Sequence, residues 1–145
     1  MQIVKGNVEN LDEVLNVFLL ARGEMEYLPT LHTPEETKEF IFSLLKKGNT
    51  YIAKDMFVVG FVTIEEGWIE HLYIHPKFQN KGIGKSLLDT AKKLPPGGLQ
   101  LWVFEDNVRA IKFYEREGLK LIKKRDRKEQ DNEEGLPDRL YKWVT

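Results

Sequence analysis

The chain contains no cysteine among its 145 residues. Zinc ribbons, iron–sulfur centres, CxxC redox motifs and thiol nucleophiles all require cysteine sulfur, so these classes of chemistry are excluded. A domain of this length buries enough apolar surface to fold without disulfides or structural metals. The composition predicts one domain over residues 1–145, and the lack of cysteine is compatible with the reducing cytoplasm, where we expect the protein.

The sequence also has little excess of either charge and no long apolar run. Its 22 Lys and Arg residues oppose 23 Asp and Glu residues, which leaves a formal net charge of −1. This balance predicts no nucleic-acid partner, because no basic excess is present to follow a phosphate backbone. The longest nearly apolar stretch, residues 56–62, is far shorter than the roughly 20 residues of a membrane-spanning helix. No apolar signal block follows Met1, and we expect no membrane partner.

Capping residues and apolar spacing predict four helices separated by strands. Helices are expected after an Asn10 cap, after the capping box Thr33-Pro34-Glu35-Glu36, after Gly84 and after an Asn107 cap. Runs of β-branched and aromatic residues predict strands over residues 2–8, 51–53, 56–65, 68–75, 99–104, 119–123 and 140–144. The order βααβββαβαββ predicts an α/β fold with a mixed central sheet, helices on its faces and a parallel strand-helix-strand unit at residues 68–104.

A polar, glycine-bearing loop at residues 79–86 carries the clearest chemical signal. Backbone N–H groups in such a turn, opening onto a helix N-terminus, form a cradle for phosphate. A P-loop would need glycine at position 79, which is glutamine, although Gly84-Lys85-Ser86 matches its last residues. A dinucleotide fingerprint that begins at Gly82 would need glycine at position 87, which is leucine. Both nucleotide-binding interpretations therefore fail at a defined residue.

Two segments of the chain resemble the GNAT superfamily of N-acetyltransferases. Gln79-x-x-Gly82-x-Gly84, after a strand that ends Leu72-Tyr73-Ile74-His75-Pro76, is similar to the acyl-CoA pyrophosphate loop of that family. The family's Asn-x-x-Ala-x-x-Phe-Tyr-x-x-x-Gly segment is matched by Asn107, Ala110, Phe113, Tyr114 and Gly118. The resemblance covers the element order of the whole chain, and residues 68–118 are diagnostic. It implies a GNAT-like acyl-CoA N-acyltransferase fold with acetyl-CoA as co-substrate and no metal.

The resemblance also implies how acetyl-CoA is held. The strands at residues 68–75 and 99–104 are expected to splay apart, so that unpaired backbone groups bond the pantetheine arm. The pyrophosphate would lie on the backbone amides of the glycine loop. Asn107 would bond the pantetheine or the wall of the cleft, or serve only as a helix cap. The expected co-substrate residues are Leu72, Tyr73, Ile74, Gln79, Asn80, Lys81, Gly82, Ile83, Gly84, Lys85, Ser86, Asn107 and Phe113.

The expected catalytic residues are Tyr114 and Glu70. Tyr114 matches the family's general acid, which donates a proton to the departing thiolate; the alternative is an ordinary inward-facing core residue. Strand alternation places residues 68, 70, 72 and 74 on one face, where Glu70 would take the amine proton through water. A solvated edge charge at Glu70, with water alone as base, is the alternative. Some relatives carry a glutamate on the next strand, but Trp102 occupies the matching position.

The expected acceptor is a primary amine. Family members use the connection between the first two helices as one wall of the acceptor pocket, and here this connection carries Glu24, Glu26 and Tyr27. Acidic groups there would attract a cationic amine, although each could also be a solvated helix end. A metal site is not expected, because His71 and His75 would lie roughly 13 Å apart on a strand.

These observations predict an acetyl-CoA-dependent N-acetyltransferase that acts by direct transfer in a ternary complex, because no cysteine can carry an acyl intermediate. A homodimer is compatible with this prediction. The alternative is a catalytically inactive acyl-CoA-binding, regulatory or protein-interaction module of the same fold, with the charged segment at residues 125–139 as its contact surface.

Overall fold

The structure is a computed structural model that describes residues 1–95, 97–126 and 132–144. One mixed sheet has the strand order β1-β2-β3-β4-β5-β7-β6. Its strands are β1 (Gln2–Lys5), β2 (Thr50–Asp55), β3 (Phe57–Glu65), β4 (Trp68–Ile74), β5 (Gly98–Phe104), β6 (Lys120–Arg125) and β7 (Asp138–Val144). The helices are α1 (Leu11–Gly23), α2 (Pro34–Lys47), α3 (Ile83–Lys92) and α4 (Val108–Arg116), with short 3₁₀ turns η1 (Val8–Asn10) and η2 (Pro76–Phe78).

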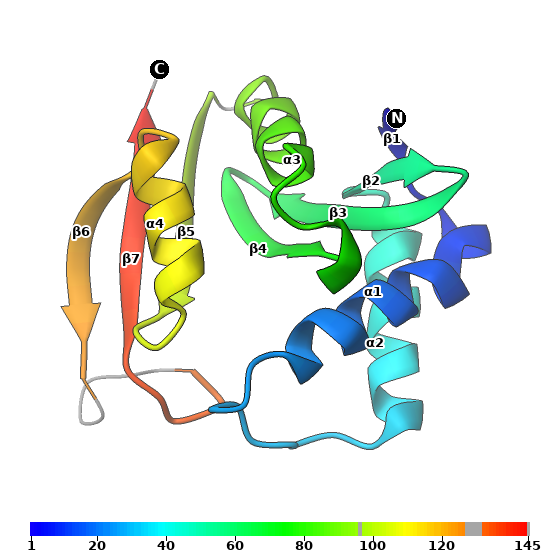
Figure 1. Cartoon of the computed structure of the whole chain (residues 1–145), viewed down its shortest axis with the longest axis horizontal. Helices are drawn as coiled ribbons and strands as arrows, with labels where there is room; N and C mark the ends of the chain where they lie inside the picture. The colour runs from blue at the N-terminus through cyan, green and yellow to red at the C-terminus, as the bar shows by residue number, and fades with distance from the viewer. Residues whose placement is uncertain (96, 127–131, 145) are drawn as a thin grey trace.

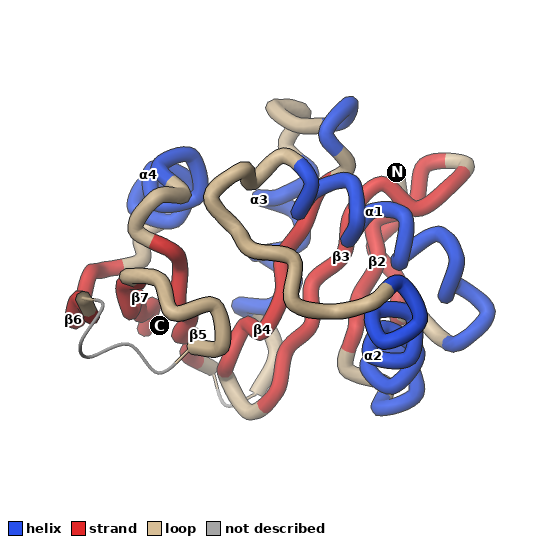
Figure 2. The backbone as a smooth tube through the Cα atoms, turned by 90° about the horizontal axis from the view of Figure 1, so that it is seen from below, coloured by secondary structure: helices blue, strands red, loops and turns tan. Residues whose placement is uncertain are grey.

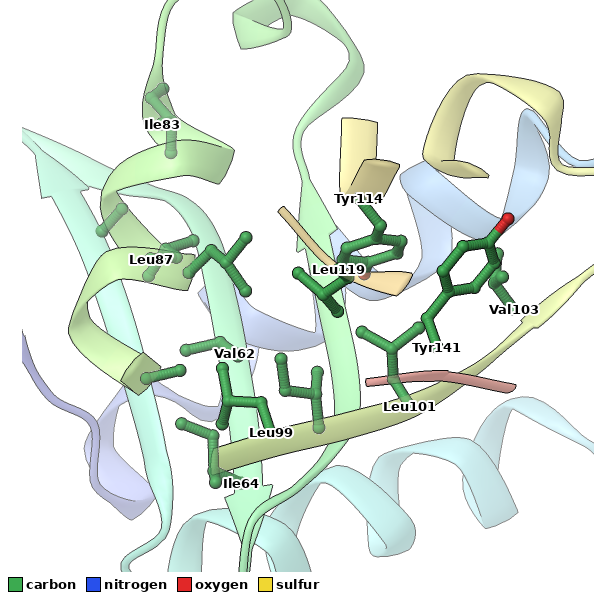
Figure 3. Packing of buried hydrophobic residues seen from close by; sticks show 14 of the residues in the cluster. Val62, Ile64, Ile83, Leu87, Leu99, Leu101, Val103, Tyr114, Leu119 and Tyr141 are labelled. Carbon is green, nitrogen blue, oxygen red and sulfur yellow. The ribbon is translucent and has the colours of Figure 1, made fainter. Parts of the chain in front are cut away.

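This order confirms the predicted fold class. Helices α1 and α2 pack on one face of the sheet, where Val17, Ile41 and Phe61 belong to one buried cluster (Figures 1 and 2). Helices α3 and α4 cover the other face, where Leu87 and Leu101 belong to a second cluster. Figure 3 shows this second cluster, with Tyr114 of α4 beside Leu119. The central strand β3 is therefore buried on both faces, as expected for a layered α/β fold, whereas the edge strand β6 stays largely exposed.

The helix caps explain where the first two helices begin and end. Thr33 and Glu36 form the predicted capping box, and Gly48 ends α2 in the left-handed region at φ 77°. The cap predicted at Asn10 is different, because the Asn10 side chain accepts a hydrogen bond from the Asn7 N–H instead of capping α1. Asn7 itself caps η1, and this turn ends β1 earlier than the sequence pattern suggested.

The first hairpin turns one residue later than predicted. Met56 adopts a positive φ of 67° and separates Asp55 from its partner Phe57, so the strand β3 begins at Phe57. Met56 is also 95% exposed, although the sequence pattern assigned it to an apolar strand. A tight hairpin tip therefore overrides the apolar character of this residue.

Strands β4 and β5 are parallel neighbours that separate almost at once. Their only registered pair is Trp68 with Gln100, where the Gln100 N–H donates to the Gly67 carbonyl at 2.9 Å. Beyond this pair β5 follows β7 over its whole length, from Gly98 to Phe104. Figure 1 shows β4 turning away from β5. The splay that the family resemblance implied is therefore present.

A bulge in β4 changes which side chains share a face. Thr63 of β3 pairs with His71, but Ile64 pairs with Ile69, so Glu70 is an extra residue without a partner. Ile69 consequently belongs to the same buried cluster as Leu72 and Ile74. The prediction that residues 68, 70, 72 and 74 share one face is wrong, because strict alternation breaks at the bulge.

Candidate functional site

The expected co-substrate residues gather around one cavity between β4, α3 and α4. This space, here called the β4–α3 cavity, has a volume of about 660 Å³, which is within the range of small-molecule sites. Three of the predicted site residues, Lys81, Ser86 and Glu70, do not line it. The predicted residues that do line it are Leu72, Tyr73, Ile74, Gln79, Asn80, Gly82, Ile83, Gly84, Lys85, Asn107, Phe113 and Tyr114.

The turn before α3 presents backbone donors to this cavity. Asn80 and Gly82 both adopt positive φ, 62° and 80°, which folds the loop tightly before the helix. No side chain caps the N-terminus of α3, and its first turn contains no acidic residue. The first N–H groups of the helix are therefore available to an anion, and the helix dipole favours negative charge there.

Basic side chains add positive charge around the same turn. The Lys85 ammonium contacts Asp89 at 3.1 Å and Glu117 at 3.2 Å, and these hydrogen bonds raise the pKa of Lys85. Arg109 donates to the Gln79 side chain and so links α4 to the loop. Arg116 also lines the cavity. Arg109 of α4 thus contacts the glycine loop directly, and Lys85 links α3 to Glu117, the residue that follows α4.

Gly84 allows α3 and α4 to approach closely. A Cβ added at Gly84 would lie 3.4 Å from Cζ of Phe113, at the close limit of van der Waals contact. The two motifs that the sequence analysis found separately therefore meet in space at this contact. The second glycine of the motif has a packing role, whereas the first, Gly82, has a conformational one.

Asn107 is the cap of α4 and also lines the cavity. Its Oδ1 accepts a hydrogen bond from the Ala110 N–H at 3.2 Å, which confirms the capping interpretation. Asn107 also lies on the cavity wall. The cap and the cavity contact are therefore compatible roles of one side chain.

Tyr114 lies at the inner end of the cavity. It is 7% exposed, and its ring packs against Phe113 with ring centroids 5.2 Å apart. Burial raises the pKa of Tyr114 above its usual value, and the nearby Tyr73 adds to this effect. The phenol therefore stays protonated at neutral pH, which is the state a general acid requires.

Two further tyrosines line the same cavity. The hydroxyl of Tyr27, in the connection between α1 and α2, is buried and has no hydrogen-bond partner within the described part of the chain. Burial raises the pKa of Tyr27 to about 12, and Tyr73 and Asp106 contribute to the rise. The ring of Tyr27 reaches Phe104 of β5 at a centroid distance of 5.9 Å. The sequence analysis placed Tyr27 in an acceptor wall but gave no signal that it would reach β5.

The residue expected to act as the base lies elsewhere. Glu70 is exposed and lines neither this cavity nor the second cavity described below. Partial burial and the neighbouring Glu65 raise the pKa of Glu70 above its usual value. Trp102 is also absent from the cavity wall, and the Arg125 guanidinium stacks 3.5 Å from its ring centroid. Of the acidic residues in the helix connection, Glu24 lines the cavity and Glu26 does not.

His71 in β4 and His75 just after β4 lie in different environments. His75 accepts a hydrogen bond from the Lys77 N–H at 3.1 Å, while His71 faces α1 and α2. Within the described ranges, no group of three or more potential ligands is placed to hold a metal ion. None of the helices in this part of the chain is long and apolar enough to cross a membrane.

Comparisons with known proteins show which family the chain resembles. A model of the acetyltransferase (GNAT) family matches residues 11–119. YiaC of Escherichia coli, a peptidyl-lysine N-acetyltransferase, is 34% identical over 91 residues, which are 62% of this chain and 59% of YiaC. YjaB of Salmonella typhimurium, also named a peptidyl-lysine N-acetyltransferase, is 38% identical over 63 residues, 43% of each chain. The chain thus matches less than two thirds of the length of these two relatives.

Solved structures show the same fold over nearly the whole chain. The solution structure of apo YjaB from Escherichia coli has a TM-score of 0.78, with 21% identity, and covers 99% of this chain and 97% of its own. A GNAT-family acetyltransferase from Bacillus cereus also reaches 0.78, with 16% identity and coverage of 99% and 96%. With the family model, the splayed strands and the loop before α3, these likenesses lead to one conclusion: the chain belongs to the acetyltransferase (GNAT) family.

Proposed function

We propose that the protein is an N-acetyltransferase that transfers the acetyl group of acetyl-CoA directly to a primary amine. The observation that carries this proposal is the β4–α3 cavity, which joins an uncapped helix N-terminus to a buried tyrosine. The N-terminus of α3 suits the pyrophosphate, and the free backbone edge of β4 suits the pantetheine amides. These features support a site in which the thioester lies near Tyr114.

Acetyl transfer at this site would follow a defined order of bond formation and bond cleavage. The amine nitrogen attacks the thioester carbonyl carbon, and the tetrahedral intermediate collapses with loss of the thiolate of CoA. Tyr114 gives its proton to this sulfur, and the amine loses one proton to water or to a base reached through water. Because the chain has no cysteine, no thioester on cysteine intervenes between donor and acceptor.

We infer that the acceptor is a lysine side chain in a peptide. The names of YiaC and YjaB support this class of acceptor, and this chain aligns with 59% of YiaC and 43% of YjaB. Glu24 on the cavity wall adds negative charge that favours approach of a cationic amine. Cytoplasmic location and a homodimer stay predictions.

The direct test is release of the CoA thiol from acetyl-CoA in the presence of a lysine peptide. We expect release that depends on both substrates and a mass increase of one acetyl group on the peptide. Binding of acetyl-CoA without any release, across peptides and small amines, would instead identify the catalytically inactive module. An acetylated enzyme formed before the acceptor is added would contradict direct transfer.

A further inference from the structure

A second cavity lies beside β4 at His71, enclosed by α1, α2 and the segment between them. This α1–α2 cavity has a volume of about 750 Å³. Its walls carry the apolar side chains of Phe18, Leu28, Leu31 and Phe40. Glu133 and Glu134, which precede β7, close it from the far side. The walls therefore come from distant parts of the chain and leave a space large enough for a residue-sized ligand.

The rim of this cavity is negatively charged. Its lining includes the carboxylates of Glu36, Glu39, Glu133 and Glu134, against the guanidinium of Arg22 and the imidazole of His32. Arg22 lies 3.5 Å from Glu134, and His32 lies 3.0 Å from Glu133. Glu36 on α2 accepts a hydrogen bond from the Thr33 N–H and interacts electrostatically with His32, while Glu39 forms no ion pair among the described residues. The carboxylates on the rim therefore outnumber its basic groups. The field in the cavity thus favours a cation.

An unpartnered buried nitrogen points to a ligand with N–H donors. Nδ1 of His71 is buried, and it has no hydrogen-bond partner among the described residues. The His71 ring lies between aromatic neighbours, edge-on to Phe40 at 5.3 Å and stacked on Tyr73 at 6.1 Å. Burial lowers the pKa of His71 to about 4, so the imidazole is neutral at physiological pH, and Nδ1 is an acceptor when the ring proton is on Nε2, the tautomer that the proposal requires. An orphaned group of this kind costs stability unless something else bonds it.

We propose that the α1–α2 cavity binds an organic cation that carries N–H donors on an apolar stem, the chemistry of a basic side chain. The stem packs against Phe18 and Phe40, the charge lies in the field of the glutamates, and one N–H donates to the His71 imidazole. The β4–α3 cavity is next to it, because Tyr73 lines that cavity while its ring stacks on His71. The cation is therefore a second basic residue of the acceptor peptide, an assignment that rests on the proposed function.

The probe for this inference is 2-phenylethylguanidinium, which has the required stem and charge but is not an amine that can be acetylated at neutral pH. We expect saturable binding by calorimetry in the absence of acetyl-CoA. The uncharged analogue 2-phenylethylurea, of nearly the same shape, should bind at least tenfold more weakly. Saturable binding that is equal for both compounds would overturn the role of the charged rim, and no binding of the cation would overturn the site.

Two variants locate the binding. His71→Phe keeps a ring in place but removes the acceptor nitrogen, and it should weaken binding of the cation at least tenfold. The double change Glu133→Gln and Glu134→Gln should weaken it several-fold and reduce its salt dependence. Glu35→Gln is the matched control, because Glu35 lies in the first turn of α2 but lines neither cavity. Wild-type affinity in the His71→Phe protein, with its fold verified by circular dichroism, would place the ligand elsewhere.

Kinetics separates this inference from the proposed function. The cation should compete with a lysine peptide that carries a second basic residue, and it should not compete with acetyl-CoA. Binding of the cation without thiol release from any acceptor would contradict the acetyltransferase proposal and leave the cavity as a binding site. Thiol release that the cation fails to inhibit at saturating concentration would leave the enzyme and overturn the assignment of the cavity to the acceptor.

Discussion

The Arg22 guanidinium donates a hydrogen bond to the Tyr73 hydroxyl at 3.3 Å, and this contact connects the two cavities. Arg22 lines the α1–α2 cavity, whereas Tyr73 lines the β4–α3 cavity. The same guanidinium lies over the Phe18 ring at 5.5 Å. Each cavity is therefore lined by a side chain that is hydrogen-bonded to a side chain lining the other cavity.

The first prediction concerns the glycine loop. Gly82→Val places a branched side chain at φ 80°, a conformation that strains residues other than glycine. We expect it to abolish the rise in melting temperature that acetyl-CoA causes in the wild type. Gly97→Val is the matched control, because Gly97 has φ 94° and lies outside both cavities. An equal loss of acetyl-CoA binding in both variants would point to strain alone.

The second prediction concerns Tyr114. Tyr114→Phe removes one oxygen and keeps the ring in the core, so the melting temperature should change little. Turnover should fall by roughly 10²-fold or more, with the Michaelis constant for acetyl-CoA nearly unchanged. Tyr141→Phe offers the converse control, since the Tyr141 hydroxyl donates to Glu115 at 2.7 Å and lies outside the cavity. Near-wild-type turnover of the Tyr114 variant would assign this residue to packing only.

The third prediction concerns the base. We expect Glu70→Gln to keep the wild-type pH dependence of turnover, because the Glu70 carboxylate lines neither cavity and water can take the amine proton. The measurement is the rate of thiol release between pH 6 and pH 9. A loss of activity concentrated at low pH, where fewer acceptor amines are neutral, would assign the base to Glu70 instead.

The fourth prediction concerns stability and pH. The pKa of His71 is about 4 in the folded protein and about 6.5 when the chain is unfolded. Between these values the unfolded chain binds a proton that the folded one does not, so His71 lowers the free energy of unfolding as pH falls from about 6.5 to 4. From pH 7.5 to pH 5 the wild type should lose about 2 kcal/mol more than His71→Phe.

Urea denaturation of both proteins at each pH measures this difference. At pH 7.5 the His71→Phe protein should be more stable than the wild type by about 1 kcal/mol, because it removes a buried nitrogen without a partner. Parallel losses of stability in the two proteins would show that His71 reaches water or a partner when folded. Reduced stability of the variant at both pH values would indicate that the imidazole packs better than the larger ring.

Local signals in the sequence were sufficient for the order of elements and for most of the co-substrate site. The Thr33 capping box and the glycine loop depend on neighbours within a few residues, and both appear where the pattern placed them. The bulge at Glu70 could not be predicted in this way, because it arises from pairing with β3. One extra residue in the pairing was enough to move this carboxylate away from the expected face.

Contacts between residues that are far apart in the sequence could not be predicted either. The α1–α2 cavity joins Phe18 to Glu134, and the Tyr27 ring reaches Phe104 across the opening between β4 and β5. No periodicity in the sequence reports such contacts. His71 was considered only as a metal ligand together with His75, and its role as a neutral group in an aromatic environment appears only when α1 and α2 are in place.

Trp68 and Gln100 form the single residue pair between β4 and β5, so the sheet consists of two parts that are joined at one end. One part contains β1 to β4 and the other contains β5, β7 and β6, and within each part neighbouring strands are paired along several residues, with local register shifts. Beyond this pair β4 and β5 have no registered backbone pairing, and side-chain contacts such as those of Arg109 with Gln79 and of Lys85 with Glu117 connect the two parts. A molecule that forms hydrogen bonds with the backbone of both β4 and β5 would therefore join the two parts at a second place. Without such a molecule, the protein should unfold first between β4 and β5 when it is pulled or heated.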